Sequence, residues 1–485
     1  MAEQNLKERT IKGVGWSAAD SFLGQGVTFI VGLVLARLLS PAEYGLIGIC
    51  TIFTTILTGI VDSGFSNALI RKNDASDEDY NTMFITNFIV SIVLYVLLYL
   101  LAPTISCFFS RSELIDLIRA IGLILVLQSL SLVQNTILTK RLDFKTKTKA
   151  SLVSSILSGL IGIGLAYSGY GVWSLVGQLL SKHFLYTLCL WFLNKWYPKL
   201  QFSINSFIYM WGFGWKLMAS GLLNNIWNQL YQVVVGRYYS ATTLGQYSRS
   251  KEYASIFSTN LTSIVQRVSF PVLSELQNDR SRMVSGYRRI IKMTMFLTAI
   301  IMIFLGAIAE PMIYCLIGPQ WHQAATFLPL ICISMSLYPL QSINLNMLQV
   351  QGRSDLFLVL EIIKKTIALI PLLLGIFIDI YFMLIGSIVV GIISFFLNSY
   401  YSGKELHYSS MAQLKDVAPS YCIAVIIAIP IYFFKYIPLS YWIILPMQII
   451  TGIFIFFIIC KIVQISEYEE LKSLFVKGFL KVFKK

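Results

Sequence analysis

Residues 82–102 read TMFITNFIVSIVLYVLLYLLA, a run of 21 residues without a charged side chain. A helix needs roughly 20 mostly apolar residues to cross the hydrocarbon core of a bilayer. The rest of the chain has the same character, since 56% of its 485 residues are hydrophobic, 13% are charged, and the mean hydropathy is +0.70. Soluble domains have about 25% charged residues. The composition therefore predicts an all-α polytopic membrane protein and argues against a soluble enzyme, a nucleic-acid-binding protein or a disordered chain.

Apolar runs separated by short polar breaks predict about fourteen transmembrane helices. The shortest breaks follow Ser168 and surround Asp379, and the first run is too long for a cleaved signal peptide. The spans are expected near residues 14–36, 45–69, 82–102, 114–137, 150–168, 171–193, 208–236, 246–268, 291–314, 324–349, 356–378, 381–401, 417–435 and 440–461. The largest loop is expected at about 267–290.

The placement of Lys and Arg predicts the orientation of the chain. With both termini in the cytoplasm, the cytoplasmic segments hold 27 of the 38 Lys and Arg residues, and the opposite loops hold four. Cytoplasmic loops of membrane proteins carry such an excess. The net charge of +14 is therefore attributed to orientation and not to nucleic-acid binding. The seven cysteines form no CxxC and no zinc spacing, so neither a metal nor a cofactor is expected.

An internal repeat relates the two halves of the chain. Arg37, Ser40 and Gly45 recur, 200 residues later, as Arg237, Ser240 and Gly245. The first and seventh spans also share a glycine–tryptophan pattern, and six spans separate them, so the repeat is parallel, an architecture found in transporters. The expected organisation is an N-lobe at 1–200, a C-lobe at 201–402, a helix pair at 403–465, and an amphipathic basic tail at 466–485 that lies on the inner leaflet.

Polar residues gather inside the predicted spans, above all in the seventh. An ionisable group in a span is costly and usually faces a cavity or a partner. We expect one hydrophilic cavity lined by spans one, two, seven and eight, although single Ser and Thr residues also serve ordinary helix–helix hydrogen bonding. The candidate cavity residues are Lys216, Asn224, Asn228, Gln232, Arg249, Lys251, Arg37, Arg237 and Asp62.

Four further charged residues are candidates for coupling transport to an ion, namely Asp20, Glu361, Lys365 and Lys182. Glu361 and Lys365 are four residues apart, so a structural salt bridge between them is the alternative. Lys182 lies midway along the sixth span and pairs, in the alternative reading, with an acidic group.

The cations of the expected cavity indicate an anionic cargo. Arginine matches phosphate with a planar fork, while lysine acts as a point charge. The Asn, Gln, Ser and aromatic side chains suit sugar hydroxyls and sugar faces. A phosphate with sugars attached fits both kinds of group.

Seven short motifs are spread along the chain. They are LARLLSPAEYG at 35–45, DSGFSNALI at 62–70, RLDF at 141–144, GYGVWSLV at 169–176, FPVLSELQND at 270–279, GPQW at 318–321 and GRSDL at 352–356. As a set, and in this order, they resemble the motifs of the Wzx-type polysaccharide flippases, a family of the multidrug/oligosaccharidyl-lipid/polysaccharide exporter superfamily. The resemblance covers about residues 10–400, and each motif alone is weak.

This resemblance implies a fold of two six-helix lobes in a V, with alternating access between the two faces. It implies an activity that moves a polyprenyl-pyrophosphate-linked oligosaccharide, of the undecaprenyl type, from the inner to the outer leaflet of a bacterial inner membrane for surface polysaccharide biosynthesis. Polysaccharide polymerase and chain-length proteins are the implied partners. The related lipid II flippases hold pyrophosphate with arginines of the first, second and eighth spans. Spans one and two lack a deep arginine here, so Lys216, Arg249 and Lys251 are the expected substitutes.

Two other functions are weighed against this one. A multidrug exporter of the same superfamily would share the fold but is disfavoured by the polysaccharide-family motifs. A membrane polymerase or ligase would need acidic or metal-binding residues at a membrane face and usually a large outer loop, neither of which the sequence indicates. The chain has no Walker A motif, so ATP hydrolysis is not the expected drive.

Overall fold

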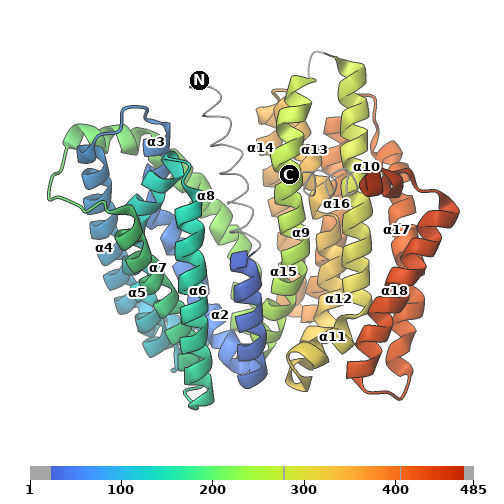
Figure 1. Cartoon of the computed structure of the whole chain (residues 1–485), viewed down its shortest axis with the longest axis horizontal. Coiled ribbons are helices and arrows are strands. Elements are labelled where there is room, and N and C mark those ends of the chain that lie inside the picture. Colours follow the sequence, from blue (N-terminus) through green and yellow to red (C-terminus); the bar gives the residue numbers. More distant parts are fainter. Residues whose placement is uncertain (1–22, 277–278, 405, 474–485) are drawn as a thin grey trace, which may run out of the picture. The chain divides into compact units, whose positions relative to one another are not determined.

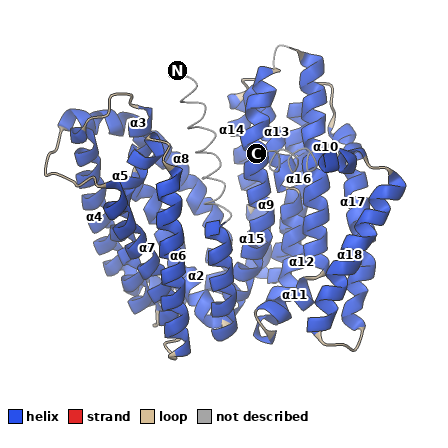
Figure 2. Ribbon diagram, in the orientation of Figure 1, coloured by secondary structure: helices blue, strands red, loops and turns tan. Residues whose placement is uncertain are grey.

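The computed structural model describes residues 23–276, 279–404 and 406–473, and these residues form helices joined by short loops (Figures 1 and 2). No strand occurs in the part of the chain that the structure describes. The prediction of an all-α membrane protein is therefore confirmed. By contacts, the chain divides into two compact units, Met1–Gly245 and Gln246–Lys485.

The first unit packs its helices around α5. In it α4 contacts α5, α6 contacts α7, and α2 contacts both α5 and α8. Its elements are the helix Leu23–Leu38, α2 (Pro41–Asp62), α3 (Phe65–Arg71), α4 (Asp77–Phe109), α5 (Leu114–Lys140), α6 (Phe144–Tyr167), α7 (Val172–Asn194), α8 (Ile204–Tyr238) and the first turn of α9 (Ala241–Glu275).

The second unit is built around α10, which packs against α12, α13 and α17. Hydrogen bonds place α9 along η1 and α12: the Gln246 side chain donates to the carbonyl of Gln320 (2.7 Å), and Ser258 donates to that of Met335 (2.7 Å). The remaining elements are α10 (Arg280–Ala307), α11 (Ala309–Leu316), η1 (Pro319–Trp321), α12 (His322–Ser336), α13 (Tyr338–Val350), α14 (Ser354–Ile367), α15 (Leu369–Phe377), α16 (Ile380–Lys404), α17 (Ser410–Phe433), η2 (Phe434–Tyr436) and α18 (Tyr441–Val463).

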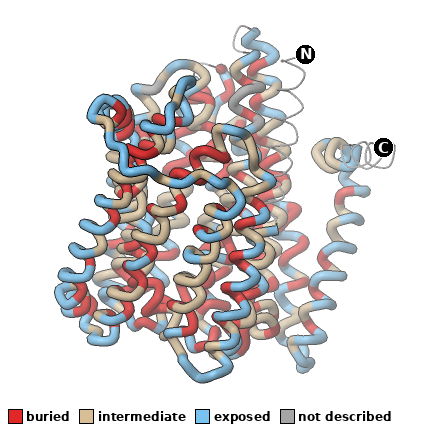
Figure 3. The backbone as a smooth tube through the Cα atoms, turned by 60° about the vertical axis from the view of Figure 1, so that its left-hand side comes forward, coloured by how far each residue is buried: buried red, intermediate tan, exposed pale blue. Residues whose placement is uncertain are grey.

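Among the described residues, nine helical segments are long and apolar enough to cross a membrane. The other predicted spans coincide with the helix Leu23–Leu38, of which only this part is described, with α7, with the polar helices α8 and α9, and with the pair α14 and α15. Figure 3 shows exposed stretches running along the helices, and α4 exposes the large apolar residues Ile89, Val93 and Leu100. Such a surface is expected where a helix meets lipid.

The breaks predicted on the weakest sequence signals are present. Helix α6 ends at Tyr167 and α7 begins at Val172, while α15 ends at Phe377 and α16 begins at Ile380. Four predicted spans are instead divided internally, between α2 and α3, α10 and α11, α12 and α13, and α14 and α15. Pro339 and Pro371 follow the last two breaks, because proline lacks the amide that would continue the preceding helix.

The prediction of a large loop at 267–290 is wrong. Helix α9 continues to Glu275 and α10 already starts at Arg280, so two long helices extend through most of that segment. Its charged residues are compatible with helix, and α10 is capped by Asp279, whose carboxylate accepts from the amide of Arg282 (3.1 Å). Polarity marks the end of a membrane span but not the end of a helix.

The 200-residue repeat corresponds to two equivalent helix starts. Ser40 caps α2, and Glu43 closes the capping box by accepting from the Ser40 amide (2.6 Å). Ser240 caps α9 by accepting from the amide of Thr243 (3.0 Å). A Cβ built on Gly45 would lie 1.8 Å from the carbonyl oxygen of Ala241.

This contact is reciprocal. A Cβ on Gly245 would lie 1.9 Å from the carbonyl oxygen of Pro41, and Pro41 and Ala241 are themselves repeat equivalents. The two helix starts therefore cross backbone to backbone, and each repeat glycine supplies the space for the other copy. The predicted lobe boundary at 200/201 remains a prediction, because the compact units divide at Gly245 and compactness is a different property from internal repetition.

Candidate functional site

Helix α8 carries the predicted polar stripe and packs on the first unit. Ser203 caps it, and its buried face includes Met210, Gly214 and Val235. Gly214 meets the break between α2 and α3, where Gly64 has φ +71°. A Cβ on Gly214 would lie 2.5 Å from the carbonyl oxygen of Ser63. This backbone contact fixes which side of α8 is packed.

The predicted cavity residues of α8 lie in the middle of the helix, between its two buried ends, since no residue from Trp215 to Val233 is buried. Lys216, Asn224 and Asn228 are exposed, and Gln232 is half-buried. Lys216 lies about 18 Å along the helix axis from Ile204 at 1.5 Å per residue, well inside the helix. No ion pair between described residues involves Lys216. The middle of α8 therefore exposes an ammonium and carboxamide groups in the first unit.

Asp62 lies at the end of α2, next to α8. Its carboxylate accepts hydrogen bonds from the Ser66 hydroxyl (2.5 Å) and the Ser66 amide (3.4 Å), and Thr136 in turn donates to the Ser66 hydroxyl (3.1 Å). One turn earlier, a Cβ on Gly59 would lie 3.0 Å from Nδ2 of Asn225. The structure thus brings the polar residues of the second and seventh predicted spans together.

Arg37 and Arg237 are exposed and precede the two equivalent helix starts. The guanidinium of Arg237 lies 5.3 Å from the ring centroid of Phe108. The two arginines therefore flank the glycine crossing. Arg237 lies about 32 Å along α8 from Lys216, at 1.5 Å per residue.

Of the candidate coupling residues in the first unit, Asp20 lies outside the described residues. Lys182 of α7 donates to the hydroxyl of Thr28 at 3.4 Å, so this ammonium has a neutral partner across the helix interface. Whether either residue couples transport to an ion remains a prediction.

Arg249 and Lys251 belong to the second unit and lie on different sides of α9, because two helical positions are about 200° apart. Arg249 is buried, and its Nη1 lies 2.7 Å from the Glu252 carboxylate. Its guanidinium lies 5.9 Å from the ring centroid of Trp321. Nζ of Lys251 lies 6.0 Å from the ring centroid of Tyr247. A phosphate that reached Arg249 would have to compete with a carboxylate that is already in place.

The acidic residue of α14 does form a salt bridge. Glu361 pairs with Lys364, three residues on, and this spacing places both side chains on one face of the helix. Whether Glu361 or Lys365 couples transport to an ion remains a prediction.

One charged cluster of the second unit was not recognised as a unit. Arg288, Arg289 and Lys292 of α10 each face a carboxylate, and two of those carboxylates come from residues 466–473, a helix that we call the tail helix. The spacing of the three cations on one helical face was visible in the sequence. The acidic start of the tail was overlooked because the lysines that follow it led to the prediction of a basic segment.

Comparisons with known proteins agree with the motifs. Residues 34–326 match the family described as polysaccharide biosynthesis protein. The chain is 28% identical to the succinoglycan biosynthesis transport protein ExoT of Rhizobium meliloti over 67% of this chain and 66% of that one, just under two thirds of that relative's length. It is 26% identical to the teichuronic acid biosynthesis protein TuaB of Bacillus subtilis, over 73% of each chain. It is 22% identical to the lipopolysaccharide biosynthesis protein WzxC of Escherichia coli, over 76% of each.

Solved structures show the same fold. The lipid II flippase MurJ, in an inward closed conformation, matches with a TM-score of 0.71 and 18% identity over 95% of this chain and 99% of that one. An inward-facing multidrug resistance MATE family transporter of the MOP superfamily matches with a TM-score of 0.56 and 16% identity over 80% and 99%. With its family matched over more than half of its length, the chain belongs to the polysaccharide biosynthesis protein family and has the fold of MOP superfamily transporters.

Proposed function

We propose that this protein moves a polyprenyl-pyrophosphate-linked oligosaccharide repeat unit from the cytoplasmic to the outer leaflet of a bacterial inner membrane, by alternating access. It breaks no covalent bond in doing so, and a surface polysaccharide polymerase with its chain-length proteins would use the product. Membership of the family supports polysaccharide biosynthesis, and the fold supports transport.

The observation that carries the proposal is the exposed polar middle of α8, residues 215–233. A membrane-embedded cation needs an anion or water, since lipid cannot solvate it. Lys216 has no carboxylate partner among the described residues, so it is available to the phosphate oxygens of a cargo. Asn224 and Asn228 follow it along the helix, and carboxamides donate to and accept from sugar hydroxyls.

The glycine crossing supports the alternating part of the mechanism. Gly45 and Gly245 let the starts of α2 and α9 approach without side chains between them. A contact of backbone on backbone can act as a pivot, because it leaves no interdigitated side chains that would have to unpack. The repeat makes the contact symmetric, as expected where two related halves move about a common point.

Replacement of Lys216 in a strain that lacks its own flippase tests this function. Lys216→Ala should abolish surface polysaccharide and cause the lipid-linked repeat unit to accumulate, as measured by mass spectrometry of the extracted lipid pool. Lys216→Arg, which keeps the positive charge, is the matched variant and should retain polymer. Immunoblots of the membrane fraction control for protein abundance.

Normal polymer from Lys216→Ala would contradict the role of the α8 stripe. The alternative function, export of an organic ion or drug, makes a different prediction for the same strain. It would leave the lipid-linked pool unchanged upon deletion of the protein and would alter drug resistance instead.

A further inference from the structure

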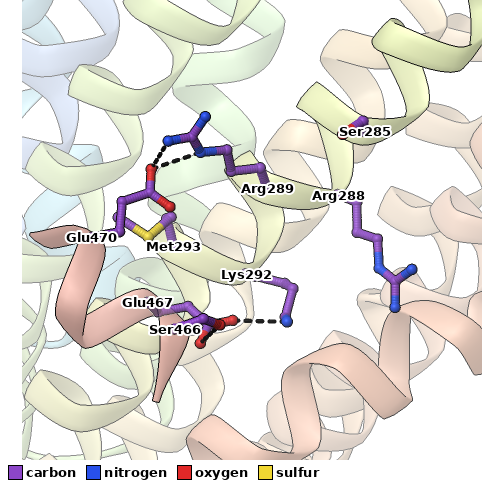
Figure 4. Close-up of a pocket in the computed structure, with 8 residues that line it drawn as sticks. All are labelled: Ser285, Arg288, Arg289, Lys292, Met293, Ser466, Glu467 and Glu470. Atoms are coloured by element: carbon purple, nitrogen blue, oxygen red, sulfur yellow. Dashed lines mark hydrogen bonds and ion pairs between the residues drawn. The ribbon is translucent and has the colours of Figure 1, made fainter. Parts of the chain in front are cut away.

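A pocket of about 230 Å³ lies in the second unit where the tail helix meets α10 (Figure 4). Three cations of α10 line it, together with the hydroxyl-bearing Ser285 and the thioether of Met293. The Lys and Arg distribution assigns this end of α10 to the cytoplasmic face, at the level of the inner-leaflet headgroups. The pocket does not involve α8.

The carboxylate partner of Arg288 is part of the packed core. Arg288 binds Asp416 of α17 through two hydrogen bonds, Nε to Oδ2 at 2.5 Å and Nη2 to Oδ1 at 2.7 Å. Asp416 is only 10% exposed and also accepts from the hydroxyl of Tyr408 (2.7 Å). Because α17 packs along α10, this partner cannot leave without unpacking the unit.

The partners of the other two cations are of a different kind. Glu470 accepts from Nε of Arg289 (2.6 Å), and Glu467 lies 2.9 Å from Nζ of Lys292. Both come from the tail helix, which follows α18 after a turn at Gln464 with φ +50°. The tail is held further by Tyr468, whose ring centroid lies 5.9 Å from that of Phe456. Arg289 is 68% exposed, and such solvent-exposed ion pairs contribute little stability.

We propose that Arg289 and Lys292 form a binding site for the phosphate of an anionic inner-leaflet lipid, and that Glu467 and Glu470 occupy this site when the tail helix is docked. A carboxylate and a phosphate diester both offer anionic oxygens to a guanidinium fork and an ammonium. Displacement of the tail would leave these two cations without their carboxylate partners, and α18 ends next to the tail with the exposed apolar residues Ile462 and Val463.

The sequence of the tail favours a lipid as the competing anion. The docked part holds Glu467, Glu469 and Glu470, whereas residues 471–485 carry five lysines among apolar residues. Basic amphipathic segments bind anionic membrane surfaces. The same lipid would therefore attract the basic part of the tail and fill the site that the acidic part leaves, so tail release and lipid binding favour one another. The site does not depend on the transport reaction.

Native mass spectrometry of the full-length protein in a neutral detergent tests the proposal, with phosphatidylglycerol and phosphatidylcholine as the probes. Arg289→Gln/Lys292→Gln should weaken retention of phosphatidylglycerol by about tenfold or more, as the loss of charge-assisted hydrogen bonds implies. Glu467→Gln/Glu470→Gln should strengthen it severalfold. The matched control Arg282→Gln/Arg353→Gln removes two exposed charges outside the pocket and the tail and should leave retention unchanged.

Each other outcome overturns part of the proposal. Equal weakening by the control pair would mean general surface attraction and no built site. Unchanged retention in Glu467→Gln/Glu470→Gln would mean that the carboxylates do not occupy the site. Equal retention of phosphatidylcholine would exclude selection for an anionic lipid, and displacement by inorganic phosphate at the same concentration as the lipid would identify the free ion as the ligand.

Discussion

Lys216 of α8 and Arg288 of α10 are both cations on helices of a membrane protein, yet their surroundings are opposite. Arg288 has a bidentate carboxylate that is itself fixed by Tyr408. Lys216 has no ion-pair partner among the described residues, and it lies on the unpacked side of a helix whose other side is fixed by a glycine contact. Under the proposed function, the two residues illustrate the difference between a charge that holds the fold and a charge that meets a ligand.

This difference has a physical origin. Removal of the partner of a paired cation destabilises the folded state. A ligand that binds such a cation must therefore first break the existing ion pair, which weakens its binding. An unpaired cation costs energy in the absence of the ligand and gains most when the ligand arrives. Binding energy for an anionic headgroup is therefore expected at Lys216, and stability at Arg288.

Charge reversal should separate the two roles most clearly. Lys216→Glu should abolish transport with normal protein abundance, because the carboxylate would repel the phosphate. Arg288→Glu should instead lower the abundance of the protein, because it places a second carboxylate beside Asp416. Surface polymer and membrane-fraction immunoblots measure both effects. The comparison fails if Arg288→Glu is abundant but inactive, or if Lys216→Glu does not fold.

The packing of α8 offers a second way to disturb the site. Gly214→Ala should lower the stability of the protein by about 1–3 kcal/mol, typical of overpacking, because its Cβ would meet the Ser63 carbonyl. Gly212→Ala is the matched control, since no heavy atom lies within 4 Å of its Cβ and alanine favours helix by up to about 1 kcal/mol. Thermal unfolding of both purified variants gives the answer. Equal destabilisation by the two substitutions would mean that α8 is not seated on this contact.

A double-mutant cycle measures how strongly Arg288 is tied to its partner. Arg288→Ala and Asp416→Ala should each destabilise the protein, and together they should cost less than the sum, with a coupling of about 1–2 kcal/mol for a bidentate, partly exposed pair. The Lys216→Ala variant should show no loss of stability in the same assay. A coupling near zero would remove the distinction between a structural and a ligand-binding cation.

The smallest expected effect is the response of the tail to pH. Burial alone would raise the pKa of Glu467, but the hydrogen bond from Lys292 and the neighbouring Ser466 hold it below the usual value of 4.5. The pair therefore stabilises the docked tail above pH 4.5 and loses this contribution as the pH falls through the lower folded value.

Fluorescence energy transfer between labels on the tail helix and α10 should show release on acidification, with an energy below about 1 kcal/mol. Glu467→Gln should show much less pH dependence. A wild-type signal that is independent of pH down to the unfolding of the protein would contradict the role of this pair.

The sequence was sufficient for the fold class, for the breaks near Ser168 and Asp379, and for the repeated cap serines, because these depend on local composition and spacing. It could not reveal that Pro339 and Pro371 divide spans, since proline also occurs inside other helices, as Pro103 does in α4. It did not predict the glycine crossing, because a contact between residues 200 positions apart depends on tertiary packing. The docked tail helix was missed for the same reason.

Within the candidate site, the carboxamides of α8 were predictable as a group because helical periodicity places Asn224, Asn228 and Gln232 within about 80° of one another. Burial was not predictable: Arg249 is buried beside Glu252, whereas Lys251, two residues on, is half-buried. The sequence alone could not single out Lys364 as a partner of Glu361, because positions three and four residues away are equivalent in a helical pattern.

Photo-crosslinking from α8 tests the central claim most directly. A photoreactive amino acid at Asn224, on the polar stripe, should capture the diphosphate-linked oligosaccharide in membranes that synthesise it, and mass spectrometry should identify the adduct. The same amino acid at Ile226, which is 39% exposed and points about 160° away from Asn224 and about 80° away from Lys216 around the helix, should capture phospholipid instead. Equal capture of the glycan lipid at both positions, or capture at Ile226 alone, would contradict the assignment of the polar middle of α8 to the cargo.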